Sequence, residues 1–246
     1  MKRSSGKPNV LERILAGLGA HELGVLLGFA GVAAGLLVFV ALADSVVDGR
    51  TQGFDRRLLL AMRHSGDLTP LGPPALQEAA RDLTGLGGPT VLTLLTLVTG
   101  GFLLLDGKRQ MALFVYGSVA GGLLLSTILK ALFERPRPDI VPYAADFSSA
   151  SFPSGHSMLS AVTYLTLGAL LARSQRRKRL KAYFLLMAFL LTLLVGLSRV
   201  YLGVHWPTDV LAGWTAGGSW AIVCWLAARR LQRRQVLETG NASSSV

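Results

Sequence analysis

The chain has 246 residues, of which 51% are hydrophobic and only 16% charged, and its mean hydropathy is +0.47. The apolar residues form long blocks rather than amphipathic stripes, which excludes an ordinary water-soluble domain. The formal net charge of +11 could suit nucleic acid, but the basic residues lie between the apolar blocks, so no nucleic-acid partner is predicted.

Six apolar blocks have about the ~20 residues that a helix needs to cross the hydrocarbon of a bilayer. They predict an all-α, polytopic membrane protein whose residues 1–246 form one bundle of six transmembrane helices. The fourth block is the weakest, because it is short and carries Ser, Thr and a histidine. The blocks are 23–43, 88–105, 111–133, 156–172, 182–198 and 208–228.

The basic residues predict the orientation of this bundle. Sixteen of the 25 Lys and Arg fall in segments that lie inside if the N-terminus is cytoplasmic. Both tails, 1–21 and 229–246, are then cytoplasmic, and 44–87, 134–155 and 199–207 face outward. The strong basic bias suggests a multi-pass protein of a bacterial inner membrane.

The long outward segment 44–87 holds two short amphipathic patterns. In FDRRLLLAMRH, Phe54 and Leu58 share one helical face, and in ALQEAARDL, Leu76 and Ala80 do so. We expect short helices that lie on the membrane surface. The pattern leaves open whether they pack on the bundle or contact a lipid substrate.

Polar residues interrupt the end of the third block. An ionisable residue such as Lys130 is costly at this depth and is a candidate for a functional site, although it could also snorkel to the surface. The prolines of the Arg135-Pro136-Arg137-Pro138 sequence stop the helix and hold both arginines in fixed directions. A guanidinium on such a turn can donate two hydrogen bonds to a phosphate.

Two further clusters contain histidine. The FPSGHS sequence places Ser154, Gly155 and His156 where a helix begins, a pattern that could also be a simple helix cap. At the junction of the last two blocks, Asp209 lies four residues after His205. The carboxylate can accept a proton from one imidazole nitrogen, so that the other nitrogen presents its lone pair.

The predicted topology places all of these residues on the outer face, although they come from three separate segments. Two histidines, one carboxylate and several cations on one membrane surface indicate a site for a phosphorylated anion. The candidate residues are Lys130, Arg137, Ser154, Gly155, His156, Arg199, His205 and Asp209.

These residues carry a resemblance to the type 2 phosphatidic acid phosphatase (PAP2) superfamily, whose signature has three motifs. Lys130 through Arg137-Pro138 matches K-x6-R-P, and residues 153–156 match P-S-G-H. Ser198-Arg199 through His205 to Asp209 matches S-R-x5-H-x3-D. Residue types and spacings agree throughout, and the six-span layout is similar to the membrane branch of the family.

The resemblance implies a mechanism. His205 would attack phosphorus, oriented by Asp209, and form a phosphohistidine, while His156 would protonate the leaving oxygen and then activate water. The three cations Lys130, Arg137 and Arg199 would hold the phosphoryl oxygens, assisted by Ser154 and the Gly155 amide. The scheme requires no metal and no cofactor.

The expected substrate is a membrane lipid that carries a phosphate or diphosphate at headgroup level. Undecaprenyl diphosphate is the leading candidate, and phosphatidylglycerol phosphate, phosphatidic acid and a lipid A phosphate are alternatives. A lipid phosphotransferase would share the same first step. A vanadate-dependent haloperoxidase uses a similar anion site, and a non-catalytic lipid transporter is the third rival. The expected partners are the lipid substrate and the bilayer, and the sequence does not identify protein partners.

Overall fold

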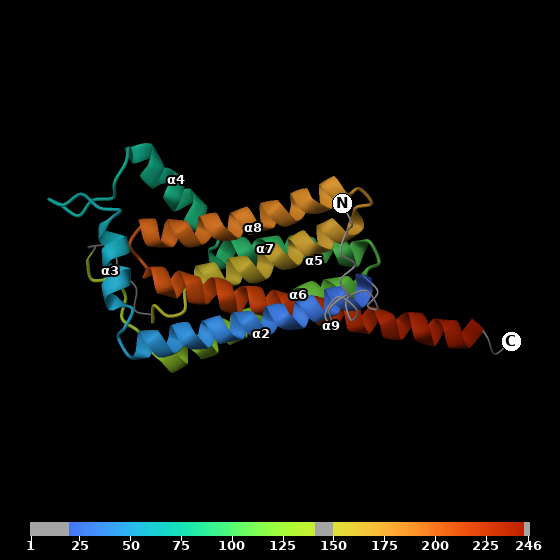
Figure 1. The fold of residues 1–246 in the computed structure, drawn as a ribbon. Coiled ribbons are helices and arrows are strands. Elements are labelled where there is room, and N and C mark those ends of the chain that lie inside the picture. The colour runs from blue at the N-terminus through green and yellow to red at the C-terminus, as the bar shows by residue number, and fades with distance from the viewer. Residues whose placement is uncertain (1–19, 141–149, 244–246) are drawn as a thin grey trace, which may run out of the picture.

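The structure, a computed structural model, describes residues 20–140 and 150–243. In these ranges long helices lie side by side along one axis, and the short helices α3 and α4 lie at one end of them (Figure 1). The β-pairing described there is an isolated bridge between Arg63 and Pro70. The helices are α2 (Ala20–Val47), α3 (Gln52–Leu60), α4 (Pro74–Gly85), α5 (Pro89–Leu105), α6 (Arg109–Phe133), α7 (Gly155–Ser174), α8 (Lys178–Tyr201) and α9 (Pro207–Ser243).

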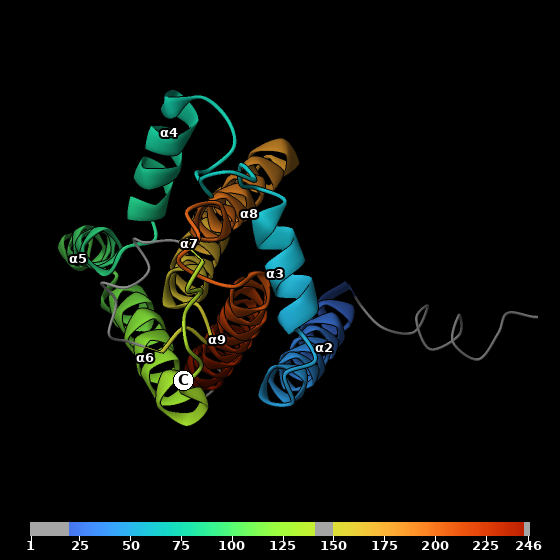
Figure 2. The ribbon, with the colours of Figure 1, turned by 90° about the vertical axis from the view of Figure 1, so that its left-hand side faces the viewer.

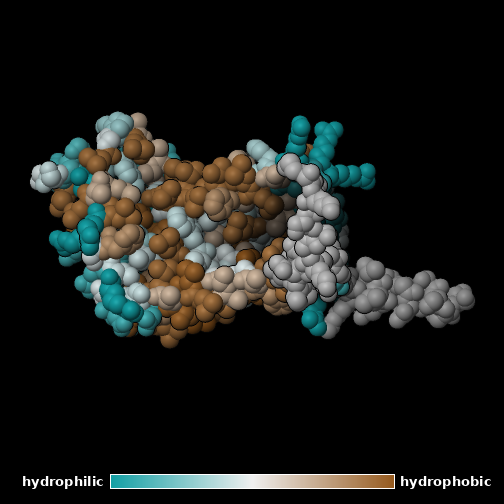
Figure 3. Space-filling view, in the orientation of Figure 1, coloured by the Kyte–Doolittle hydropathy of each residue, from teal (hydrophilic) through white to brown (hydrophobic). Residues whose placement is uncertain are grey.

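The predicted helical membrane bundle is confirmed, with one refinement at the second span. Five helices are long and apolar enough to cross a membrane, namely α2, α6, α7, α8 and the Pro207–Arg230 part of α9. Helix α5 has 17 residues and forms a sixth candidate span with α4, from which it is bent by 49°. On the face shown in Figure 3, apolar side chains predominate along the middle of the bundle, and strongly hydrophilic side chains gather at its ends.

Helix α7, the weakest span by sequence, lies in the interior of the bundle. Of an 18-residue window of α7, 67% is buried, against at most 44% for the other spans. Small residues allow this position: a Cβ on Gly168 would lie 2.5 Å from the Cβ of Ala188 in α8, and one on Gly217 of α9 would lie 2.4 Å from the Met158 carbonyl oxygen. The polar, small-residue composition therefore reflects helix contacts rather than a poor span.

The 44–87 segment forms the two short helices that its patterns predict. In α3 the apolar face turns away from the protein, since Phe54 is 52% and Leu58 is 38% exposed, while Asp55 and Leu59 on another face are buried. This orientation suits a helix at the boundary of a membrane. In the view along the bundle, α3 crosses the end of the bundle and runs between α2 and α8 (Figure 2).

Helix α9 extends beyond its membrane span into the predicted C-terminal tail. The candidate span ends at Arg230, and the helix continues through Ser243 within the tail, 229–246. The predicted N-terminal tail lies almost entirely outside the described residues, and α2 begins at Ala20.

An aromatic cluster ties the chain before α7 to the bundle. Phe152 is fully buried, with its ring centroid 5.1 Å from that of Phe133 in α6 and 5.9 Å from that of Phe39 in α2. Aromatic pairs at these distances add to the energy of their burial. The cluster fixes the start of α7, which carries the FPSGHS sequence, against two other spans.

Candidate functional site

The three motif segments meet at the end of the bundle that carries α3 (Figure 2). The Ser154 amide at the start of α7 donates to the Asp209 carbonyl oxygen of α9 at 2.9 Å. Helix α6 also lies close to the start of α7, because a Cβ on Gly155 would lie 3.3 Å from the Cε of Lys130. Residues up to 79 positions apart in sequence therefore line one small volume.

His205 and Asp209 form the buried pair that the spacing predicts. The Nδ1 of His205 lies 3.3 Å from one oxygen of Asp209, and the side chains are 1% and 0% exposed. The Trp206 amide donates to the same oxygen at 2.9 Å. A proton on Nδ1 satisfies this network, which leaves Nε2 with its lone pair.

The pKa of His205 is held well below its ordinary value of 6.5. Burial is the main cause, and the positive charges of Arg199, Arg137 and Lys130 add to it. The imidazole is thus neutral near pH 7, as a nucleophile must be. The three cations come from two of the motifs, and the Nη1 of Arg137 is 3.3 Å from the Nε2 of this ring.

Two of the cations are oriented by side chains and carbonyls near them. The Nη1 of Arg137 donates to the Val204 carbonyl oxygen at 2.9 Å and lies 3.3 Å from the His205 Nε2. Lys130 donates to the Ala150 carbonyl oxygen at 3.0 Å. These contacts fix the two positive charges near His205.

Arg199 is held from the 44–87 segment. Its Nη1 donates to Thr84 Oγ1, at the end of α4, at 3.0 Å. The Arg199 side chain is buried, yet its Nε finds no acceptor in the described part of the chain. A buried donor without a partner is costly, so a ligand oxygen is the natural acceptor for this N–H group.

Ser154 is the N-cap of α7 and is fully buried. Its hydroxyl oxygen accepts from the Ser157 amide at 3.4 Å and from the Ser157 hydroxyl at 3.0 Å. The Ser154 proton is still available to donate. Gly155 is the first residue of α7, and the first amides of a helix have no acceptor within the helix, which suits an anion.

His156 lies in the same first turn, beside the bend between α4 and α5. A Cβ on Gly87 would lie 3.5 Å from the His156 Cβ, and one on Gly88 would lie 3.9 Å from its Nε2. Glycine at both positions lets the backbone of this bend approach the imidazole closely. The 44–87 segment thus forms one wall of the site.

The sequence reasoning missed a second layer of the site, which is built on Arg135. The prolines hold Arg135 in a fixed direction, as expected, but its guanidinium points into the protein rather than toward a phosphate. Its two terminal nitrogens bind Asp209 at 2.6 Å and Asp55 of α3 at 2.7 Å. Asp55 is fully buried and also accepts from the Thr208 amide at 3.0 Å and from its hydroxyl at 2.6 Å.

One sequence signal could have indicated Asp55. It is a lone acid one helical turn before Leu59, on a different face of α3 from the Phe54/Leu58 stripe. A buried carboxylate requires a partner, and the unassigned Arg135 was available. However, Asp55 and Arg135 are 80 positions apart in the sequence, so the spacing of the motifs could not predict that they pair.

Among the described residues, no three His, Cys, Asp or Glu side chains gather as metal ligands. The negative groups at the site, Asp55 and Asp209, are both paired with Arg135. The charge available to a phosphate in this part of the chain comes instead from lysine and arginine. The donor set thus fits an anion and does not fit a divalent metal.

An uncharged imidazole among three cations, at one end of a helical membrane bundle, defines a membrane enzyme that acts on phosphate groups. The chain belongs to the PAP2 superfamily, whose family model matches residues 111–233. Its relatives are named phosphatases, and the chain is accordingly a multi-pass membrane hydrolase of phosphate esters.

Two relatives illustrate the range of substrates in this group. Phosphatidylglycerophosphatase B of Bacillus subtilis is 33% identical over 182 residues, which cover 74% of this chain and 86% of the relative. The undecaprenyl-diphosphatase of Sulfolobus acidocaldarius is 30% identical over 131 residues, which cover 50% of this chain and 57% of the relative.

The fold is similar to that of a solved structure. The crystal structure of a transmembrane PAP2-type phosphatidylglycerolphosphate phosphatase from Bacillus subtilis matches with a TM-score of 0.71 at 30% identity. The match covers 81% of this chain and 96% of that chain. The similarity therefore includes segments outside the three motifs.

Proposed function

We propose that the chain is a lipid phosphatase that works through a phosphohistidine on His205. The observation that supports this most is the environment of the His205 Nε2. The ring is neutral, its other nitrogen is anchored on Asp209, and the Nη1 of Arg137 lies 3.3 Å from Nε2. A phosphoryl group bound by the cations would lie directly in front of this lone pair.

The first step forms the bond between His205 Nε2 and phosphorus and breaks the bond between phosphorus and the lipid oxygen. His156 donates its proton to that oxygen, and the dephosphorylated lipid leaves. In the second step His156 accepts a proton from water, the water oxygen bonds to phosphorus, and the nitrogen–phosphorus bond breaks. Inorganic phosphate is released, and both histidines return to their starting states.

Lys130, Arg137 and Arg199 have the electrostatic role in this scheme. They neutralise the charge on the phosphoryl oxygens, and the unpartnered Nε of Arg199 supplies a donor that is already oriented. Because the protein groups are fixed before the substrate arrives, little reorganisation is needed at the transition state.

The proposed substrate is a lipid phosphomonoester or diphosphate whose phosphate lies at the membrane boundary. Phosphatidylglycerol phosphate is the first compound to test, because the relative and the solved structure with high coverage both carry that activity in their names. Undecaprenyl diphosphate, the leading candidate from the sequence, is the second compound to test, and a relative with lower coverage is named for its hydrolysis.

The proposed orientation places the site at the outer face of a bacterial inner membrane, with both termini in the cytoplasm. The basic loop between α7 and α8 and the turn before α6 lie at the opposite end of the bundle (Figure 1). Reporter fusions at Gly107, Gln175 and Asp139 test it: the first two should report cytoplasm and the third the exterior.

The function is tested by measuring phosphate release from a panel of lipid phosphates and diphosphates. His205→Ala should abolish release, and [³²P]-labelled substrate should leave acid-labile label on the wild-type protein and none on the variant. Label on the protein with no free phosphate, but with a new phospholipid, would identify a phosphotransferase instead. Unchanged release by His205→Ala would refute the proposal.

A further inference from the structure

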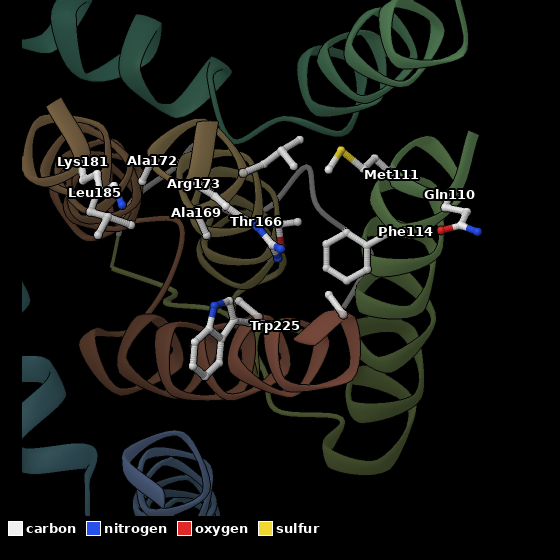
Figure 4. A pocket seen from close by; sticks show the side chains of 13 residues that line it. Gln110, Met111, Phe114, Thr166, Ala169, Ala172, Arg173, Lys181, Leu185 and Trp225 are labelled. Atoms are coloured by element: carbon white, nitrogen blue, oxygen red, sulfur yellow. The ribbon is translucent and has the colours of Figure 1, made fainter. Parts of the chain in front are cut away.

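A cavity lies between α6, α7, α8 and α9, near the C-terminal end of α7 and the N-terminal end of α8, and Figure 4 shows the side chains that line it. It has a volume of about 510 Å³. This volume is within the range of ~300–1,000 Å³ that is typical of ligand pockets. Arg173 at its rim is 17 residues after His156 in α7, which corresponds to about 26 Å along the helix. The cavity is therefore separate from the proposed active site.

The wall of the cavity is apolar and its rim is positively charged. Phe114, Leu185 and Trp225 contribute large apolar side chains from three different helices, as Figure 4 shows. Arg173, in the last turn of α7, and Lys181, in the first turn of α8, are the charged residues that line it. No carboxylate is among the lining side chains. This combination suits an anion attached to a hydrocarbon chain.

A polar atom deep in the cavity also lacks a partner. Thr166 is 5% exposed, and its Oγ1 makes no hydrogen bond within the described residues. Two other buried threonines, Thr96 and Thr192, bond the carbonyl oxygens four residues before them, at 2.6 and 2.9 Å. Thr163 in α7 also lacks a partner within the described residues, but it does not line the cavity. The Thr166 hydroxyl thus offers a hydrogen bond to a ligand that enters from the rim.

We infer that this cavity binds one anionic phospholipid from the leaflet on its own side of the membrane. The lipid phosphate lies between Arg173 and Lys181, and an acyl chain packs against Phe114 and Trp225. Thr166 is about 10 Å below Arg173 along α7, at the depth where an ester oxygen of the lipid can accept its proton. The occupant joins four helices and stabilises α7, the helix whose first turn carries His156.

Charge complementarity selects an anionic lipid over a zwitterionic one. The rim holds two cations, and a third, Arg229, stacks on the ring of Trp225 with 4.8 Å between its Cζ and the ring centroid. A choline or ethanolamine group would bring a positive charge into this region, which costs binding energy. Phosphatidylglycerol carries no such group.

The test compares binding of phosphatidylglycerol and phosphatidylcholine to the full-length protein in detergent micelles. Neither lipid carries a phosphomonoester, so the proposed active site does not consume them, and failure of one proposal leaves the other intact. Native mass spectrometry counts bound lipids, and thermal unfolding reports stabilisation. We expect one phosphatidylglycerol to bind at least tenfold more tightly than phosphatidylcholine and to raise the melting temperature.

Matched variants separate this site from general attraction to basic loops. Arg173→Gln/Lys181→Gln should abolish the preference for phosphatidylglycerol. Arg176→Gln/Lys178→Gln removes the same charge from the same end of the bundle at residues that do not line the cavity, and should retain the preference. Ala169→Phe, which fills the cavity, should block binding of both lipids.

The inference is overturned if the two lipids bind equally, or if the two double variants lose the preference to the same extent. Thr166→Val gives an independent readout that leaves the charge unchanged. It should weaken phosphatidylglycerol binding several-fold with the stoichiometry unchanged. Wild-type affinity in this variant would show that the Thr166 hydroxyl does not bind the lipid.

Discussion

Substitution of Asp55 tests whether α3 positions the catalytic pair from outside the recognised motifs. The carboxylate is fully buried and accepts three hydrogen bonds, from Arg135 at 2.7 Å and from the amide and hydroxyl of Thr208 at 3.0 and 2.6 Å. Arg135 in turn binds Asp209 at 2.6 Å. Asp55→Asn keeps the size of the side chain and removes its charge. Asp209 is then the one carboxylate of this pair that still binds Arg135.

The structure gives the expected magnitude. A hydrogen bond to a charged group contributes about 1.5–3 kcal/mol, and each ~1.4 kcal/mol lost from the stabilisation of a transition state lowers the rate about tenfold. We therefore expect Asp55→Asn to lower kcat roughly 10- to 100-fold. KM should change little, because Asp55 does not face the phosphate. Asp55→Ala is a poorer test, since breaking a buried ion pair costs about 3–5 kcal/mol of stability.

The assay is phosphate release from the best lipid of the panel, with kcat and KM measured separately. Thermal unfolding of each purified variant shows whether it is folded. Asp67→Asn is the matched control, because Asp67 belongs to the same outward segment but is exposed and accepts only from Thr69. This control should retain wild-type kinetics.

A folded Asp55→Asn variant with normal kcat would refute the reasoning. A double variant gives a second test of the route. If Asp55 acts through Arg135, Asp55→Asn should have little further effect on kcat in an Arg135→Gln background, because the two changes interrupt one network. Additive effects would mean that Asp55 influences the site by another path.

Four further predictions concern the protonation of His205, the Thr84 contact of Arg199, the close packing at Gly87, and metals. Because burial holds the pKa of His205 below 6.5, ¹⁵N NMR of labelled imidazoles should show a neutral ring with the proton on Nδ1 from pH 8 down to pH 6; a titration near 6.5, assigned with a His205→Asn sample, would contradict this. Thr84→Val removes the acceptor of Arg199 and should lower kcat/KM about fivefold, for a loss of ~1 kcal/mol, whereas Thr84→Ser should restore activity. Gly87→Ala would bring a Cβ to 2.3 Å from Val195 and should cost about 1–3 kcal/mol of stability, while Gly85→Ala, which meets nothing within 4 Å, should leave the melting temperature unchanged. Activity should persist in excess EDTA, and loss of turnover on chelation would point to a metal-dependent mechanism.

The sequence alone determined the environment of the chain and the identity of the groups at its site. Long apolar blocks indicate membrane helices because unpaired backbone groups cannot be left in hydrocarbon, and this holds whatever the helices contact. The motif spacings likewise predicted His205 next to Asp209, since four residues across a helix start bring the two side chains together. These are local consequences of chain geometry.

Only the tertiary structure decided what supports those groups. The partner of Arg135 is 80 residues away in α3, and the partner of Arg199 is 115 residues away at the end of α4. Neither follows from local periodicity, because such pairs depend on how whole helices pack. The polar composition that made 156–172 look like a poor span has the same origin, because α7 faces other helices instead of lipid. Only the packing of the bundle determines which side chains are buried from both solvent and lipid.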